Sequence, residues 1–258
     1  MLVRASLFRH GQPAPQRGQK HVLYSFQISE FRLCVCVFHL RRADRPEDSE
    51  KHLNEITARD YETMLQDYLI NKPILETDRL IIRTLNESDV ADLKEWLGRD
   101  EIYTYWGRKA SRNEKNPELM FAPDPRPWVK RKPSPDFDWG IVLKESNKVV
   151  GMIAVFDIQN ARMGDIGYRV NPEYWNMGIT TEALKEVVRF IFENTEMDRL
   201  NGRADVRNIA SNKVMEKCGF IKEGTVRQGK MVSVYCDYNI YGMLRDDYVG
   251  LISSSHSR

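Results

Sequence analysis

Residues 167–184, with the sequence GYRVNPEYWNMGITTEAL, decide the fold of this chain of 258 residues. From residue 166 to residue 170 every second residue is apolar, as on the buried face of a β-strand, and the Asn-Pro pair at 171–172 ends that strand. After a short loop centred on Gly178, apolar residues return at helical spacing. They are Ala183, Leu184, Val187, Val188, Ile191 and Phe192. The stretch therefore predicts a strand, a tight turn and the start of a helix.

The turn around Gly178 is a candidate anion-binding site. The first backbone N–H groups of a helix have no acceptor within the helix, and the helix dipole is positive at that end. Such groups favour a phosphate or a pyrophosphate. The residues that would contribute them are Met177, Gly178, Ile179, Thr180 and Thr181. The alternative is an ordinary strand–turn–helix joint, because short motifs of this kind also occur by chance.

The composition is typical of a soluble globular protein. Hydrophobic residues make up 41% of the chain and charged residues 29%, and the net charge of +2 predicts no strong attraction to nucleic acid or membranes. No apolar run reaches the ~18 residues of a membrane span. The cysteines lack the paired spacing of a metal site, so we read them as reduced thiols of a cytoplasmic protein. They are Cys34, Cys36, Cys218 and Cys236.

The first 72 residues differ from the rest of the chain. Residues 1–21 are basic and contain no acidic residue, and residues 54–70 could form an amphipathic helix. One interpretation is a targeting segment. The other, which we favour, is a poorly ordered or partly helical extension, since chain termini are often disordered. We therefore expect an extension over 1–72, one folded domain over 73–250 and a tail over 251–258.

The domain itself shows an alternation of strands and helices. Strands are predicted at 80–83, 139–144, 149–156, 165–170, 200–206, 220–224 and 232–244, and helices at 90–97, 181–194 and 208–217, with a loop-rich, aromatic segment at 98–138. This order predicts a mixed α/β fold of the α+β class. The sheet would be mostly antiparallel at first, with one strand–helix–strand crossover at the Gly178 loop.

Four motifs together carry a family resemblance. They are ETDRL at 76–80, IGY at 166–168, W-x-x-G and TEA within 175–183, and N-x-x-SNKVMEKCGF with a following EG within 208–224. In this order and spacing they resemble the GNAT N-acetyltransferases, in the branch similar to the ribosomal-protein alanine and serine acetyltransferases. The resemblance covers about residues 74–245. It implies the acyl-CoA N-acyltransferase fold of that family, a twisted, mostly antiparallel sheet flanked by helices.

The resemblance also implies acetyl-CoA as the co-substrate. Its pyrophosphate would lie on the Gly178 loop, which agrees with the anion site above. The pantetheine arm would lie between strands 165–170 and 200–206, with the acetyl carbonyl near Ile166, Gly167 and Tyr168.

The loop departs from the common family pattern at two positions. Asn176 replaces a glycine, and Thr180 replaces a small residue. Asparagine tolerates the left-handed backbone better than most residues, and the Thr180 hydroxyl could add a phosphate contact.

The expected chemistry is direct attack of an amine on the thioester. It needs a neutral amine, donors for an oxyanion and a proton for the leaving thiolate. Many relatives supply that proton from a tyrosine, but here the position is Met215, and the resemblance gives the role to Ser211. Asn208 would bind the pantetheine or simply cap its helix. Asp165 is the candidate general base. The alternatives are that Asp165 is only a solvent-facing strand residue, and that a water relay removes the amine proton.

These observations predict an N-acetyltransferase that moves an acetyl group from acetyl-CoA to a primary amine in a ternary complex. The acceptor would be a protein N-terminus or a small amine. The alternative is a non-catalytic, CoA-binding regulatory module. A P-loop nucleotide site is disfavoured because no lysine follows Gly178. No metal site is expected, and the long aromatic insertion and the final strand pair could support a homodimer.

Overall fold

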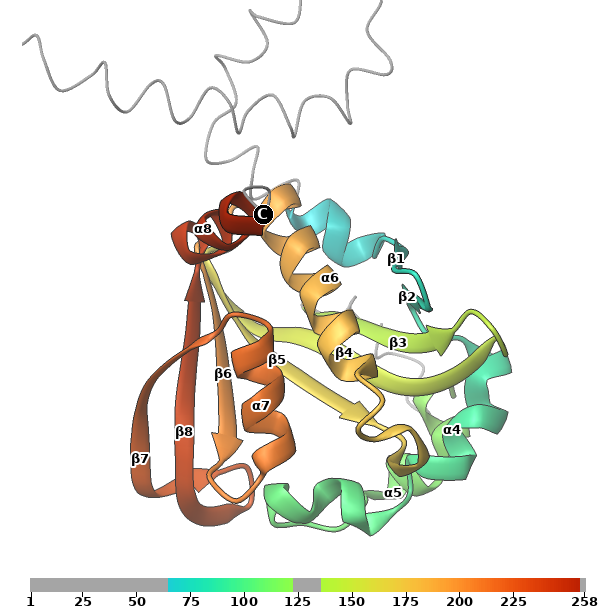
Figure 1. Cartoon of the computed structure of the whole chain (residues 1–258). Coiled ribbons are helices and arrows are strands. Elements are labelled where there is room, and N and C mark those ends of the chain that lie inside the picture. Colours follow the sequence, from blue (N-terminus) through green and yellow to red (C-terminus); the bar gives the residue numbers. More distant parts are fainter. Residues whose placement is uncertain (1–64, 123–135, 256–258) are drawn as a thin grey trace, which may run out of the picture. The chain divides into compact units, whose positions relative to one another are not determined.

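A computed structural model of the protein describes residues 65–122 and 136–255 (Figure 1). These residues belong to one compact unit, Ile56–Arg258. The predicted N-terminal extension lies outside the described residues as far as residue 64. Among the helices of the described ranges, none combines the length and the apolar character that a membrane crossing requires.

An eight-stranded sheet forms the centre of the unit, in the order β1-β2-β3-β4-β5-β6-β8-β7. The strands are β1 (Leu75–Glu76), β2 (Leu80–Arg83), β3 (Phe137–Leu143), β4 (Lys148–Gln159), β5 (Met163–Val170), β6 (Arg199–Asp205), β7 (Ile221–Met231) and β8 (Val234–Leu244). Every neighbouring pair is antiparallel except β5 and β6. The predicted fold class, a mostly antiparallel mixed sheet with flanking helices, is confirmed.

The parallel contact between β5 and β6 is short. It pairs Met163 to Asp165 with Arg199 to Asn201, and beyond these residues the two strands diverge. Figure 1 shows them close together at one end and apart at the other. Because a strand edge without a partner leaves its backbone N–H and C=O groups free for other bonds, the divergence opens two facing edges inside the sheet.

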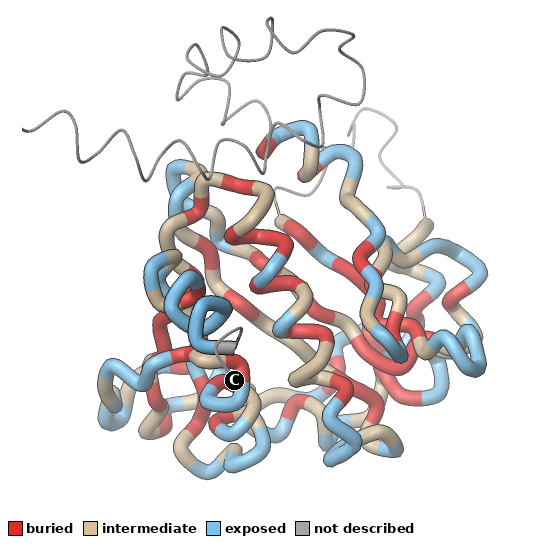
Figure 2. The backbone as a smooth tube through the Cα atoms, turned by 45° about the horizontal axis from the view of Figure 1, so that its top comes forward, coloured by how far each residue is buried: buried red, intermediate tan, exposed pale blue. Residues whose placement is uncertain are grey.

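Helices α6 (Ile179–Asn194) and α7 (Ile209–Lys217) lie on one face of the sheet, and α4 (Val90–Trp96) packs against β4. The inward face of α6 is apolar throughout its length. Its buried residues are Ile179, Ala183, Leu184, Val187, Val188, Phe190, Ile191 and Phe192. Figure 2 shows buried positions concentrated in the strands and on the helix that crosses them. Burying each large apolar side chain contributes roughly 1.5–3 kcal/mol, so this layer is the main core.

Successive strand residues alternate between the two faces. Ile141 and Ile153 belong to the core cluster under α6, whereas Val142 and Val149 belong to a separate cluster with α4. Trp96 of α4 is fully buried in that second cluster, and its indole N–H donates to the backbone carbonyl of Val149 at 3.2 Å. The polar atom of the largest side chain in this cluster therefore has a partner.

Two helical segments, one before residue 73 and one that continues past residue 250, pack against α6. Residues 65–70 are helical, and the ring of Tyr68 packs edge-on against Phe190 with centroids 5.3 Å apart. At the other end, α8 (Arg245–Ser255) includes residues 251–255, which the sequence predicts to be a tail. Tyr248 of α8 is buried beside Phe192 of α6. Both segments are held by the same long helix.

The segment between α4 and β3 contains three short helices in its described part. They are η3 (Asp100–Trp106), α5 (Arg112–Lys115) and η4 (Pro117–Met120). Tyr103 anchors this segment, because its ring is buried and its hydroxyl donates to the Leu97 carbonyl at 2.7 Å. The loop-rich segment predicted at 98–138 therefore carries local order, and its residues 123–135 lie outside the described residues.

Candidate functional site

The loop before α6 has the backbone geometry of an anion cradle. Asn176 and Gly178 both adopt left-handed conformations, with φ of 62° and 78°, so Asn176 takes the conformation expected for the residue that replaces a glycine. The first backbone bond of α6 runs from the Glu182 N–H to the Gly178 carbonyl at 3.0 Å. Within the described part of the chain, no side chain caps the start of α6. The N–H groups of its first turn are therefore available to a phosphate-bearing ligand.

Residues of the ETDRL motif hold this loop from the side of β2. The Arg79 guanidinium donates to the Met177 carbonyl through both terminal nitrogens at 3.2 Å, and its Nε donates to Glu182 at 2.7 Å. The Thr77 hydroxyl donates to the other Glu182 oxygen at 2.5 Å. Burial opposes ionisation of Glu182, but the bonds from Thr77 and Arg79 outweigh it and hold the pKa of Glu182 below its ordinary value. The sequence identifies the ETDRL motif, but it does not predict that this motif holds the loop before α6.

On β5, successive side chains reach opposite faces of the sheet and different parts of the molecule. Tyr168 extends to α7, where its hydroxyl lies 2.9 Å from the Oγ of Ser211. Arg169 extends to the opposite face and donates to Glu114 of α5 at 2.7 Å. Gly167, which precedes Tyr168, lies against Phe156, whose ring would be 2.9 Å from an added Cβ. The divergent part of β5 is thus tied to a helix on each face of the sheet.

The start of α7 brings together two of the predicted site residues. The side-chain carbonyl of Asn208 accepts from the Ser211 N–H at 3.1 Å, so Asn208 caps the helix. The Ser211 hydroxyl faces Tyr168 across the divergence of β5 and β6. Met215 packs over Gly202 of β6, where its Cε would be 2.5 Å from an added Cβ. The side chain that replaces the usual tyrosine therefore fills space against the sheet.

Asp165 lies where the parallel pairing of β5 and β6 ends. Its two oxygens accept from Arg203 at 2.8 Å and from Asn201 at 3.2 Å, both on β6. The carboxylate therefore joins the two strands at the branch point. Both oxygens have a donor, so Asp165 has a structural role at this point, and its role as general base stays a prediction.

A cluster of charges on the face opposite α7 was not predicted. Glu114 accepts from Arg108 at 2.7 and 2.8 Å, from Arg169 at 2.7 Å and from the Ser111 N–H at 2.7 Å. Burial opposes ionisation, but the donors of Arg108 and Ser111 outweigh it and lower the pKa of Glu114 to about 2. The Ser111-x-x-Glu114 spacing is a capping box that could have been found in the sequence. The partners of its carboxylate could not.

The same segment touches the far end of the sheet. The Ser233 N–H, in the turn between β7 and β8, donates to the Trp106 carbonyl at 3.2 Å. Gly107 has φ of 64° and lies so close to Val234 that an added Cβ would meet the valine Cβ at 2.3 Å. Residues 100–114 therefore connect β5, through Arg169, with the tip of the β7–β8 hairpin.

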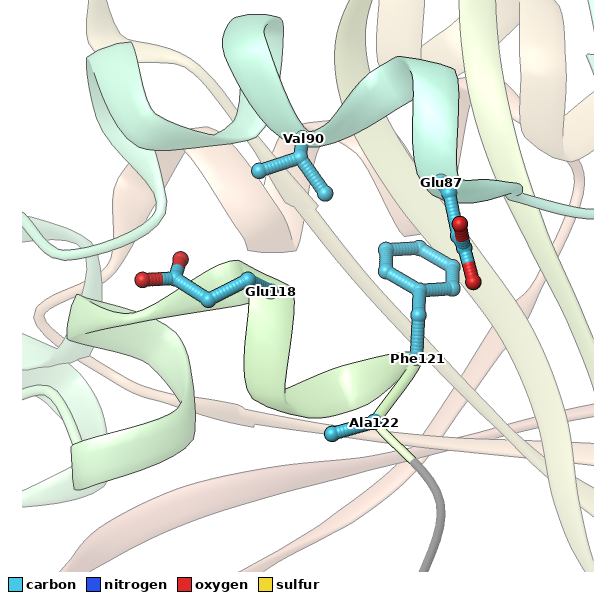
Figure 3. A pocket seen from close by; sticks show the side chains of 5 residues that line it. All are labelled: Glu87, Val90, Glu118, Phe121 and Ala122. Carbon is cyan, nitrogen blue, oxygen red and sulfur yellow. The ribbon is translucent and has the colours of Figure 1, made fainter.

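A pocket lies elsewhere, between α4 and η4. It has a volume of ≈ 380 Å³ and is lined by Glu87, Val90, Glu118, Phe121 and Ala122 (Figure 3). Phe121 extends toward the opening between Glu87 and Val90. None of the predicted site residues lines it, so it is separate from the Gly178 loop.

The fold and this site define a class of protein. The divergent β5–β6 pair beside the uncapped start of α6 is the arrangement that the family resemblance implies for an acyl-CoA-dependent acyltransferase. The family model described as "Acetyltransferase (GNAT) domain" matches residues 79–221 of this chain. The chain therefore belongs to the GNAT acetyltransferase family, and the protein is an acyltransferase.

Individual relatives agree with this assignment. An uncharacterized N-acetyltransferase, YoaA of Bacillus subtilis, is 29% identical over 175 residues, which cover 67% of this chain and 97% of the relative. The ribosomal-protein-S5-alanine acetyltransferase of Vibrio fischeri has a similar structure, with a TM-score of 0.55 at 21% identity over 69% of this chain and 99% of the other. The spermidine N-acetyltransferase of Vibrio cholerae, solved with CoA and spermine, has a TM-score of 0.54 at 15% identity. The match covers 67% of this chain and 99% of the other. These two structures show the shared fold.

Proposed function

We propose that this protein transfers an acetyl group from acetyl-CoA to a primary amine, which is a protein N-terminus or a small amine. One observation carries the proposal. The left-handed loop at Asn176 and Gly178 leads into an uncapped helix start, and the strand before that loop diverges from its neighbour. Such a loop fits a pyrophosphate, and the divergent strands offer backbone groups to an extended amide-bearing chain such as pantetheine.

The residues of the loop and of β5 would bind the donor. The N–H groups of residues 177–181 would hold the pyrophosphate, and the Thr180 hydroxyl would add a contact. Ile166 to Tyr168 would present edge backbone groups to the pantetheine and an N–H donor to the acetyl carbonyl. Arg79 stabilises this arrangement from behind, through its bonds to the Met177 carbonyl.

The chemistry places few demands on the protein. Bound acetyl-CoA supplies an activated thioester, and the positioned amine attacks it directly. Ser211 donates a proton to the leaving sulfur, since the methionine at 215 has no proton to give. Because Asp165 is engaged by Arg203 and Asn201, we assign removal of the amine proton to water rather than to this carboxylate.

The acceptor would approach from the face opposite α7. That side carries the Glu114 cluster and the contact between Trp106 and Ser233. Relatives with this fold include an enzyme named for a ribosomal-protein alanine and one named for spermidine. Both kinds of amine therefore belong in the acceptor test.

Calorimetry with CoA and thiol release from acetyl-CoA test the proposal on the full chain. The acceptor panel comprises polyamines, amino sugars and peptides with N-terminal alanine or serine. We expect CoA to bind, and Gly178→Ala to weaken binding about tenfold, because a left-handed alanine costs roughly 1–2 kcal/mol. Gly250→Ala is the matched control, since nothing lies within 4 Å of its added Cβ.

Turnover separates the enzyme from the regulatory module. One acceptor class should release thiol, and Ser211→Ala should lower kcat by at least about tenfold with little change in CoA affinity. CoA binding without turnover on any amine would favour the non-catalytic CoA-binding module. Absence of CoA binding would refute the assignment of the Gly178 loop.

A further inference from the structure

Tyr168 and Ser211 form a hydroxyl pair, and the proposed chemistry gives a role to the Ser211 hydroxyl but none to the Tyr168 hydroxyl. The tyrosine comes from β5 and the serine from the first turn of α7. The Tyr168 hydroxyl lies 2.9 Å from the Ser211 Oγ and 3.3 Å from the Ser211 backbone carbonyl. The phenol can therefore bond either to the serine side chain or to its main chain.

Each hydroxyl has a single proton, so the pair has two arrangements. In one, Ser211 donates to Tyr168 and Tyr168 donates to the Ser211 carbonyl, and both protons are used. In the other, Tyr168 donates to the Ser211 Oγ, and the serine proton is left for a third group. A serine oxygen that already accepts a hydrogen bond is polarised and donates more strongly.

The surroundings keep Tyr168 able to donate. Burial raises the pKa of its phenol above the ordinary value, so the proton stays in place at neutral pH. The nearby thiol of Cys218 is also protonated, because burial raises its pKa to about 12. Neither group offers an anion that would draw the serine proton away from the divergent strands.

The backbone of Ser211 is firmly placed, so the orientation of its hydroxyl is the remaining variable. Asn208 caps the helix through the Ser211 N–H. The next residue, Asn212, donates to the Asp205 and Asn208 carbonyls at 2.9 and 2.7 Å and accepts from Tyr241 at 2.8 Å. A helical serine without another partner tends to turn back to a carbonyl of the preceding turn. Tyr168 supplies that other partner.

We propose that Tyr168 is a positioning residue, whose hydroxyl holds the Ser211 side chain so that the serine proton is directed to the leaving sulfur. As the C–N bond forms and the C–S bond breaks, the bonding electron pair stays on sulfur and the Ser211 proton moves to it. Tyr168 donates to the seryl oxygen during this transfer. Water returns to Ser211 the proton that the amine releases. The inference rests on the proposed function.

Kinetics of two single variants and of their double variant test this role, with a fourth variant as the control. Tyr168→Phe removes only the oxygen, and we expect it to lower kcat about tenfold while KM for acetyl-CoA changes less than about twofold. Ser211→Ala should lower kcat at least as much. Because Tyr168 acts through Ser211, the double variant should be no slower than Ser211→Ala alone. Multiplying effects in the double variant would contradict the proposal.

The matched control is Tyr241→Phe. It also removes a tyrosine hydroxyl that bonds to α7, at Asn212 rather than at Ser211. We expect it to lower the melting temperature and to leave kcat within about twofold of wild type, because a lost buried hydrogen bond costs stability alone. A comparable loss of kcat in both tyrosine variants would show that Tyr168 is merely structural.

A titration of bound CoA gives a readout that does not need turnover. Ultraviolet absorbance follows the thiolate of CoA in the binary complex as pH rises. A proton donated to the sulfur stabilises the thiolate, so the thiol pKa should rise equally in Tyr168→Phe and Ser211→Ala and stay unchanged in Tyr241→Phe. An unchanged pKa in Tyr168→Phe would overturn the inference while leaving CoA binding, and with it the proposed function, intact. Failure to bind CoA would contradict both.

Discussion

Glu114 shows how one carboxylate can hold two parts of this molecule together. It is buried, with a relative exposure of 7%, and it binds Arg108 beside it and Arg169 of β5. Arg108 in turn lies over the rings of Tyr103 and Trp106, at 4.3 and 5.2 Å from their centroids. Removing one partner from a buried ion pair leaves an uncompensated charge, so each member depends on the others.

The lowered pKa of Glu114 predicts acid sensitivity. The pKa falls from an ordinary 4.5 to about 2, so the folded state takes up its proton at lower pH than the unfolded state does. The carboxylate therefore contributes at most about 3 kcal/mol above pH 4.5, and this contribution is lost as pH falls toward 2. We expect Glu114→Gln to lower the melting temperature at pH 7 and to flatten its decline in acid. Differential scanning calorimetry between pH 7 and pH 3 measures both effects.

Glu101→Gln is the control for this prediction. Glu101 is an exposed glutamate in the same segment, paired with Arg99 at 2.6 Å, and exposed pairs contribute little. It should leave the acid profile unchanged. If Glu114→Gln and wild type lose stability in parallel as pH falls, the lowered pKa of Glu114 is refuted.

At the scale of elements, most of the order along the chain was predictable from local pattern. Strand 80–83 agrees with β2, and the predicted helix at 208–217 differs from α7 only because Asn208 is its cap. The hairpin of β7 and β8 was predicted less well. Its turn at Val232, with φ of 52°, lacks the Asn-Gly or Asp-Gly signal of two-residue turns. The polar second half of β7 also lacks the alternation that marks a strand.

The site was predictable where it is local and not where it depends on distant partners. The Gly178 loop follows from a strand–turn–helix pattern within one stretch of sequence. The bonds of Tyr168 to Ser211, Arg169 to Glu114 and Arg79 to Glu182 join residues 43, 55 and 103 positions apart. Single-sequence periodicity carries no information on such pairs, because it reports only which face a residue occupies.

Arg79 gives a prediction at this scale, since it joins β2 to the start of α6. Arg79→Ala removes its bonds to Met177 and Glu182 and leaves the loop less ordered. We expect the Kd for CoA to rise about tenfold, the effect of one or two charge-assisted hydrogen bonds. Isothermal titration calorimetry measures it.

Arg162→Ala is the matched control for Arg79→Ala. The two arginine side chains are almost equally exposed, 52% for Arg162 and 51% for Arg79. Arg162 pairs with Asp198, which is not part of the Gly178 loop. Equal CoA affinity in wild type and Arg79→Ala would show that the Arg79 guanidinium does not contribute to CoA binding.

At the scale of the whole folded unit, the segment after α4 reaches the β7–β8 hairpin. The contact at Gly107 tolerates no side chain, because φ is 64° and Val234 lies against it. We expect Gly107→Ala to separate the two parts and to raise KM for the amine acceptor several-fold, while CoA affinity stays within about twofold of wild type. Steady-state kinetics and calorimetry together measure this split. A rise in the Kd for CoA of the same size would place the contact on the donor side instead.

The short parallel contact between β5 and β6 has a mechanical consequence. Only three residues on each strand join the two halves of the sheet. The two halves are therefore connected at one end of β5 and β6, next to Asp165, and can hinge about that end. An extended ligand bound between them would take the place of a missing strand and pair with both inner edges. Binding of CoA should therefore slow amide hydrogen exchange along the inner edges of β5 and β6, and leave the outer edges at β1 and β7 as they are.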